Sequence, residues 1–197
     1  MKHQLVSQAV LSTLTGYLDW INIQHIFRNN GDLLQTLCLL LSNKHLQLHA
    51  AECLLLIVSR KGKVEERKPL LILFSEGAMS LIWNAALEAN HESKEEHYYL
   101  FLKRLCQVLI ELGKQLCALW GSVPDVTQPA TFSKYLEAVM AFTQHPGQMF
   151  SSYTLSLWSS LLQHSVISQD QILLSFITRL FDTTTKALYK VGFPTQN

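Results

Sequence analysis

The chain has 197 residues, of which 48% are hydrophobic and 16% charged, and its formal net charge is +1. This composition excludes a disordered chain, and the low net charge excludes a surface that attracts nucleic acid as a whole. Any basic contact surface must therefore be local. The apolar runs are far shorter than the roughly 18 residues of a membrane span, and the first residues lack the pattern of a signal peptide. We expect no membrane insertion and a location in the nucleus or cytoplasm.

Apolar residues recur with helical spacing along the whole chain, so the sequence predicts an all-α fold. About eight helices are expected, at residues 5–18, 33–41, 44–60, 65–89, 94–120, 131–144, 148–163 and 168–190. The strongest pattern lies in the fifth of these, where apolar residues alternate spacings of four and three and form one continuous stripe. The stripe consists of Tyr98, Leu102, Leu105, Leu109, Leu112, Leu116 and Leu119.

Turn and capping signals separate the early helices. Asn29-Asn30-Gly31 is expected to turn the chain, with Asp32 placed to cap the helix that follows. Gly62 is the expected stop of the third helix. Pro69 suits the first turn of the fourth helix, and Gly77 indicates a bend within it.

The predicted helices form about four antiparallel pairs, which recur with a period of about 40 to 50 residues. The pairs cover residues 1–43, 44–90, 91–145 and 146–193, with no separate domains. Such a period is typical of a HEAT-type α-solenoid, in which each pair packs on its neighbours. On the helix pattern alone, one irregular helical bundle remains an alternative.

The four cysteines are expected to be buried and reduced. Cys38 and Cys53 lie in leucine-rich runs. Cys106 and Cys117 share one face of the same predicted helix, but they lie about 16 Å apart along its axis. A disulfide needs Cα atoms within about 7 Å. These two thiols can therefore neither bridge nor share a metal ion.

No catalytic constellation stands out. The chain has no glycine-rich phosphate loop, no G-x-S-x-G motif and no C-x-x-C motif. The best metal-like pattern is His45, His49 and Glu52, but Leu46 stands where a zinc protease needs its glutamate base. We interpret it as a solvated polar face, opposite an apolar face that contains Leu48, Ala51, Leu55 and Val58. We therefore expect no catalytic residue, no cofactor, no metal site and no enzyme.

A second group of polar residues, His91 and His97 with the acidic residues between them, is interpreted as an exposed loop and helix start. An acid/base pair is conceivable there, but no apolar pocket residue is interleaved.

One stretch, Ser59 to Pro69, concentrates positive charge and is called the basic turn below. Its cations are Arg60, Lys61, Lys63, Arg67 and Lys68, against Glu65 and Glu66. One interpretation is a solvated turn whose cations cap a helix C-terminus. The other is a basic edge that contacts phosphates, where five contacts would give a salt slope of about −4. Lys103-Arg104 would extend this edge if the third pair packs alongside. No aromatic residue lies among these cations, so base readout is not expected.

The tryptophans are expected to pack between adjacent helix pairs, because each has a large apolar area. They are Trp20, Trp83, Trp120 and Trp158. The segment after the first helix is interpreted as the corner of a helix pair, where Tyr17 and Trp20 pack back on that helix. The same corner would bury its apolar residues, which are Ile21, Ile23, Ile26 and Phe27.

The corner also carries a family resemblance. The pattern Leu11-x-x-Leu14-x-x-Tyr17-Leu18-x-Trp20-Ile21, followed by His25-Ile26-Phe27, resembles the exportin branch of the karyopherin-β (importin-β) family. Later stretches are similar to the exportin-five group of that family in particular. They are Ala50–Lys63, Glu66–Leu70, His97–Leu109, Gly113–Leu119, Lys134–Glu137 and Val191–Pro194.

The resemblance implies a HEAT-repeat segment of a larger superhelix that belongs to a nuclear export receptor. Such receptors carry double-stranded RNA hairpins, notably microRNA precursors, from nucleus to cytoplasm with Ran-GTP. The implied partners are Ran-GTP, the RNA cargo and nucleoporins, and the implied location is shuttling between nucleus and cytoplasm. No cofactor is implied, since GTP enters only with Ran. The candidate contacts to RNA or Ran are Arg60, Lys61, Lys63, Arg67 and Lys68. The alternative is a generic HEAT scaffold for protein partners, without RNA cargo.

Overall fold

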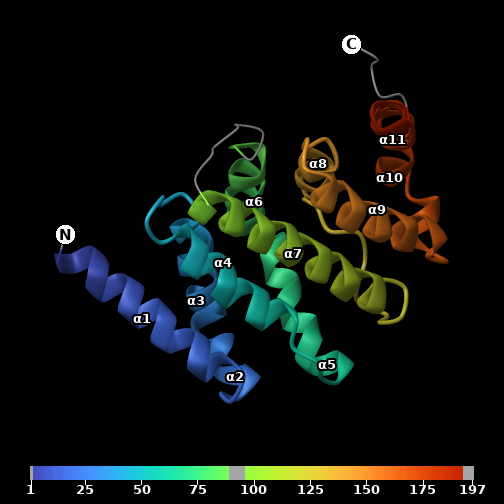
Figure 1. The fold of residues 1–197 in the computed structure, drawn as a ribbon. Helices are drawn as coiled ribbons and strands as arrows, with labels where there is room; N and C mark the ends of the chain where they lie inside the picture. The colour runs from blue at the N-terminus through green and yellow to red at the C-terminus, as the bar shows by residue number, and fades with distance from the viewer. Residues whose placement is uncertain (1, 89–95, 193–197) are drawn as a thin grey trace, which may run out of the picture.

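Helices make up the named elements of the chain in the computed structural model, which describes residues 2–88 and 96–192 (Figure 1). They are α1 (Lys2–Leu18), α2 (Ile23–Ile26), α3 (Arg28–Leu40), α4 (Gln47–Val58), α5 (Val64–Arg67), η1 (Lys68–Phe74), α6 (Glu76–Leu87), α7 (Glu96–Leu119), α8 (Phe132–Thr143), α9 (Gln148–Gln163), η3 (Ile167–Gln169), α10 (Gln171–Ser175) and α11 (Ile177–Gly192). Within the described ranges, β-type pairing is limited to one isolated bridge between Trp120 and Val123.

The longer helices stack in two layers. One layer consists of α1, α4, α7 and α9, which pack against one another in that order, and the other of α3, α6, α8 and α10 (Figure 1). Contacts between the layers, such as those of α4 with α3, of α7 with α8 and of α9 with α8, close the apolar faces into one continuous core. This is an all-α solenoid segment, as predicted, and not an irregular bundle. The pair boundaries themselves stay predictions, and the boundary at residues 90–91 lies outside the described part.

The long helix α7 is the centre of the core and packs between α4 and α9. Its predicted stripe is confirmed, since Tyr98 is half-buried and the other members are buried: Leu102, Leu105, Leu109, Leu112, Leu116 and Leu119. Full burial of one leucine side chain contributes about 1.5–3 kcal/mol. The stripe therefore supplies a large part of the free energy that joins the second and fourth pairs to the third.

Side chains from the following pair satisfy carbonyl groups at the ends of several helices. The last residue of α4, Val58, accepts a hydrogen bond at 2.8 Å from Nε2 of Gln115 in α7. The carbonyl of Phe74, at the end of η1, accepts one at 2.6 Å from Thr131, which precedes α8. In the last turn of α7, the Cys117 carbonyl lies 2.8 Å from Nε2 of His164. Because a helix C-terminus leaves carbonyls without partners in its own helix, these bonds fix how successive pairs stack.

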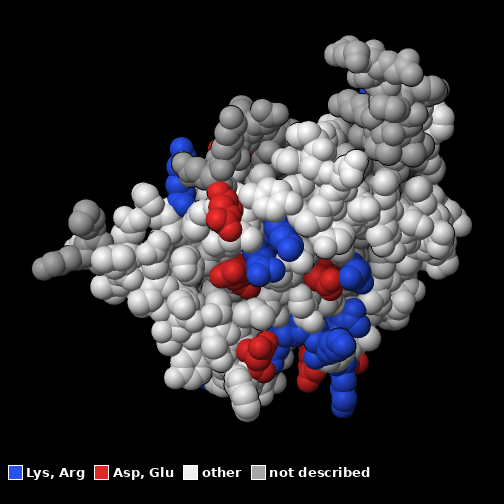
Figure 2. Space-filling view, viewed as in Figure 1, with Lys and Arg blue, Asp and Glu red and all other residues white. Residues whose placement is uncertain are grey.

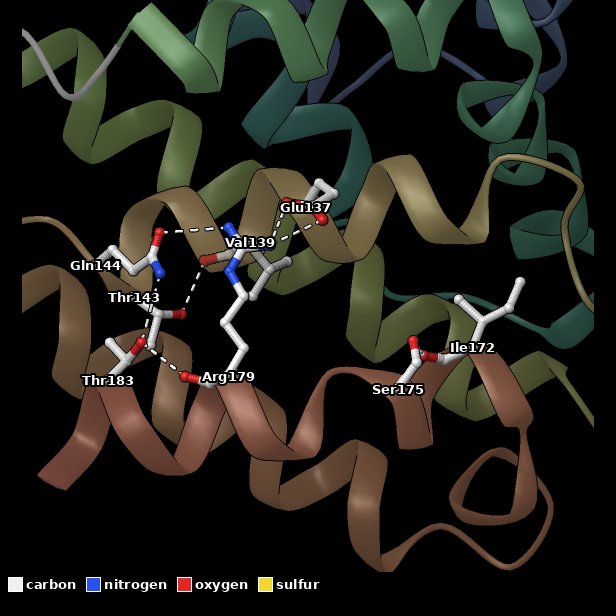
Figure 3. A network of polar contacts seen from close by, with 8 residues as sticks. All are labelled: Glu137, Val139, Thr143, Gln144, Ile172, Ser175, Arg179 and Thr183. Carbon is white, nitrogen blue, oxygen red and sulfur yellow. Dashed lines mark hydrogen bonds and ion pairs between the residues drawn. The ribbon is translucent and has the colours of Figure 1, made fainter.

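A polar network joins the last helix to the third pair (Figure 3). Nη1 of Arg179 in α11 lies 2.8 Å from both carboxylate oxygens of Glu137 in α8. Its Nη2 donates to Gln144 at 3.4 Å, and Gln144 contacts Thr183 at 3.5 Å. The charged pair is partly exposed, at 44% and 33% of the side-chain area, so it stabilises the fold by no more than about 1 kcal/mol. The network therefore contributes to the orientation of α11 but adds little to the stability of the fold.

Three predicted turn and capping features are wrong. The helix predicted at residues 65–89 bends at Ser75, whose ψ of 152° ends η1, and the two parts meet at 69°. Gly77, the expected bend, lies inside α6. Gly62 is not the helix stop, since α4 ends at Val58. The turn predicted at Asn29-Asn30-Gly31 is right, because these left-handed residues (φ 51°, 56° and 80°) interrupt α3 with a kink. The predicted cap is not, since the Asp32 side chain makes no hydrogen bond to the described residues that follow.

Other local predictions hold. Pro69 lies in the first turn of η1. All four cysteines are free thiols, and three of them are buried while Cys117 is half-buried. None of the described helices is long and apolar enough to cross a membrane by itself. Residues Val64–Phe74 and Glu76–Leu87 meet that length and composition only as a bent pair.

Candidate functional site

The basic turn connects α4 to η1 through the short helix α5, at the lower edge of the solenoid in Figure 1, where α2 also lies. Figure 2 shows Lys and Arg side chains gathered over this edge, with acidic side chains among them. The structure separates the five predicted contact cations into two groups: those with partners in the fold and those without.

Arg60 is held by the neighbouring helix pair. Its Nη1 donates a 2.8 Å hydrogen bond to the carbonyl of Leu18, the last residue of α1. A cation at a helix C-terminus offsets the negative end of the helix dipole. The capping interpretation is therefore right for Arg60, but the capped helix is α1 and not the helix that precedes the turn.

Arg67 and Lys68 also have partners. Nε of Arg67 donates a 2.5 Å hydrogen bond to Oε1 of Gln115, the buried residue that caps α4. Nζ of Lys68 lies 3.3 Å from Asp125 in an exposed ion pair, which contributes little. Gln115 thus connects α4, α5 and α7 and fixes where the basic turn lies.

Lys61 and Lys63 are exposed, and neither has an ion-pair partner among the described residues. The backbone N–H of Lys63 donates to the Glu66 carboxylate at 3.0 Å, which orders the start of α5. Only two of the five predicted cations are therefore both exposed and without a charged partner. A phosphate contact through these two would give a salt slope of about −2 instead of −4.

The prediction for Trp20 is wrong. Its side chain is 87% exposed and that of Tyr17 is 64% exposed, so neither packs back on α1. The cause is local: α1 ends at the buried Leu18, and the N–H groups of Trp20 and Ile21 both bond to the Tyr17 carbonyl at 3.0 Å. This tight turn leaves the indole outside the pair.

The predicted burial of the other three tryptophans and of the apolar residues at the corner is partly right. Trp120 and Trp158 are buried and Trp83 is half-buried. At the corner, Ile26 is buried and Ile23 and Phe27 are half-buried, but Ile21 is 37% exposed.

Trp20 and the basic turn line one pocket, called the Trp20 pocket below. It has a volume of about 340 Å³ and is lined by Trp20, Ile21, Asn22, Ile23, Arg60, Lys61, Gly62, Glu66 and Arg67. The sequence places no aromatic residue among the cations, but the bond from Arg60 to Leu18 brings the corner and the turn together. Sequence reasoning missed this pairing because the two segments lie some forty positions apart.

Lys103 and Arg104 do not extend the basic turn. The third pair does pack alongside the second, but Arg104 lies 3.6 Å from Glu52 and also donates to Gln107. Along α7, Arg104 lies about 16 Å from Gln115, the residue of α7 that contacts the turn.

The residues of the metal-like pattern do not share a helical face, because His45 precedes α4. Nδ1 of His49 is buried and has no hydrogen-bond partner, so the prediction of a solvated face is wrong for His49. The predicted apolar face is only partly right, since Ala51 and Val58 are buried but Leu48 and Leu55 are half-buried.

The remaining candidate chemistry is sparse. Across residues 2–88 and 96–192, no three metal-ligating side chains come together. His91 lies outside the described residues, and His97 is exposed.

Comparison with known proteins identifies the family. The family model described as "Exportin-5" matches residues 96–197, and the model described as "Exportin 1-like protein" matches residues 1–54. The chain belongs to the Exportin-5 family. It is 50% identical to Exportin-5 of Homo sapiens and 49% identical to that of Mus musculus, in each case over 97% of the chain. It is 26% identical to Exportin-5 of Dictyostelium discoideum over 94% of the chain. It spans 16% of the length of each of these Exportin-5 relatives.

Proposed function

We propose that this chain is part of a nuclear export receptor that carries double-stranded RNA hairpins, such as microRNA precursors, from nucleus to cytoplasm with Ran-GTP. The observation that carries the proposal is the 50% identity to an Exportin-5 over 97% of the chain. We further propose that the two layers of helices form one stretch of a longer solenoid, since the matched relatives are about six times as long. Nucleoporins are proposed partners during passage between the two compartments.

A binding experiment tests this function. A labelled hairpin RNA is titrated with a full-length receptor that contains this chain, with and without Ran loaded with a non-hydrolysable GTP analogue. We expect tight binding only when Ran-GTP is present. RNA binding that ignores Ran-GTP, or none in either condition, would contradict the proposal. Protein partners that bind independently of both Ran-GTP and RNA would instead support a HEAT scaffold.

Within this function, we propose Lys61 and Lys63 as the contact residues of the basic turn toward RNA or Ran. Arg60, Arg67 and Lys68 then act by holding the turn, because their charged groups have partners in the fold. The test is the double variant Lys61→Ala/Lys63→Ala, with Lys44→Ala as a control at the other end of α4. If the lysines touch phosphates, the salt slope of RNA binding changes by about 2. If they touch a protein, the complex of receptor, Ran-GTP and RNA forms more weakly, and the salt slope of RNA binding stays the same. If the double variant forms this complex as well as the wild type does, Lys61 and Lys63 are not contact residues.

A further inference from the structure

We propose that the Trp20 pocket is a docking site for a protein segment that presents a carboxylate beside an apolar side chain. The proposal rests on the proposed function only in treating the basic turn as a contact surface. It narrows the partner at that surface to a protein.

The exposed indole is the first reason. Trp20 is 87% exposed, and the side chains of Tyr17 in α1 and Val64 in α5 are 64% and 37% exposed. Tryptophan and arginine are the residue types most enriched among the side chains that dominate protein–protein binding energy. Here an indole and two guanidinium groups line one pocket. The backbone of Trp20 is already fixed by its bond to Tyr17, so a partner has to order only the side chain.

The positive charge of the pocket favours binding of a carboxylate. Arg60, Lys61 and Arg67 line it, against the single acidic side chain of Glu66. The carboxylate of Glu66 is already engaged by the Lys63 N–H. Arg60 and Arg67 each use one N–H group on the fold and retain other donors in a fixed fork, which matches the geometry of a carboxylate. The two guanidinium groups are therefore pre-organised.

A double-stranded RNA fits this surface less well. The bases of a duplex are stacked on one another, so an exposed indole has no base face to stack on. Duplex binding also needs a row of free cations along the phosphates, whereas within the basic turn only Lys61 and Lys63 have neither an ion pair nor a side-chain hydrogen bond to the described residues. Glu65 and Glu66 are exposed within the basic turn itself and repel a polyanion. A single carboxylate on a protein avoids most of this repulsion.

The test uses three fluorescent probes titrated against the full chain: a peptide of alternating glutamate and phenylalanine, the same peptide with glutamine for glutamate, and a blunt RNA duplex. We expect the acidic peptide to bind at least about tenfold more tightly than the neutral one. Trp20→Ala should weaken it about 30-fold, which corresponds to about 2 kcal/mol. Because Trp20 is so exposed, this variant keeps the core, which circular dichroism verifies. Phe181→Ala is the matched control, since Phe181 is 67% exposed on α11, far from the pocket in the chain.

Each outcome decides the proposal. A loss of peptide binding in Trp20→Ala and Lys61→Glu, with Phe181→Ala and Lys44→Glu unchanged, supports it. Equal binding of the acidic and neutral peptides, no peptide binding at all, or a Trp20→Ala effect confined to the RNA duplex overturns it. Failure of Ran-dependent RNA binding by the full-length receptor would instead count against the proposed function, and it leaves the peptide result intact.

Discussion

Gly113 lies where three helices meet, and the substitution Gly113→Ala tests how tightly the solenoid is packed. The residue is buried in α7. A Cβ atom added there would lie 2.6 Å from Cδ1 of Leu157 in α9 and would also collide with the hydroxyl of Tyr135 in α8. Tyr135 cannot move freely, because it is fully buried and its hydroxyl donates a 2.9 Å hydrogen bond to the Leu109 carbonyl.

Two opposing effects set the magnitude. Alanine is favoured over glycine in the middle of a helix by about 0.5–1 kcal/mol. Overpacking a core typically destabilises it by about 1–3 kcal/mol, and displacing the Tyr135 hydroxyl from its buried acceptor costs about 1–3 kcal/mol more. The packing effects are larger, so Gly113→Ala should lower the free energy of unfolding by about 1–5 kcal/mol.

The assay is urea denaturation followed by circular dichroism, with the midpoint compared at constant slope. Gly77→Ala is the control, since Gly77 lies in α6 with no atom within 4 Å of an added Cβ. That variant should be neutral or more stable by up to about 1 kcal/mol. Wild-type stability for Gly113→Ala, or equal effects of the two substitutions, would refute the close approach of α7, α8 and α9.

Three further predictions follow from single side chains. Gln115→Leu leaves the Val58 carbonyl without its partner, which should lower the free energy of unfolding by about 1–3 kcal/mol and therefore the thermal midpoint. An unchanged midpoint would show that Gln115 does not connect the pairs. Burial lowers the pKa of His145 below its ordinary value of 6.5, so the unfolded chain binds the proton more readily. The urea midpoint should therefore fall as the pH drops from about 6.5 towards the lower folded pKa, and less so in His145→Asn; equal pH profiles would contradict this. Burial raises the pKa of Cys38 to about 12 and that of Cys117 to about 11, so iodoacetamide at neutral pH should label the native thiols slowly. Mass spectrometry should detect labelling of the half-buried Cys117 before that of Cys38. The reverse order would argue against the packing of α3.

The success of sequence reasoning varied with how local the signal is. The helix α7 was predicted well because its stripe repeats along its full length, and nearly every member of the stripe is buried. The stretch from α5 to α6 was predicted as one helix, because all of its residues are compatible with a helix. The extended backbone of Ser75 breaks it there, next to a Phe74 carbonyl that is capped by Thr131 from the next pair. The sequence of the stretch itself does not indicate that Thr131 will bond to it.

The candidate site shows the same division. The concentration of cations is visible in the sequence, and so are the aromatic residues of the corner. Which cations have a partner in the fold is not visible, because the acceptors of Arg60 and Arg67 lie 42 and 48 positions away. Trp20 was expected to pack on α1, since the sequence shows its hydrophobicity but not the direction in which the turn after α1 places it.

By itself, the sequence determined the all-α class, the stacking of helices around a continuous apolar core and the position of the basic turn, because apolar periodicity and clustered charge are encoded by near neighbours in the chain. Only the tertiary structure decided that Arg60 caps α1, that Lys61 and Lys63 remain exposed without charged partners, and that Trp20 lines a pocket with Arg60 and Lys61. These features depend on contacts between helices that are distant in the chain, so their geometry exists only once the pairs have packed.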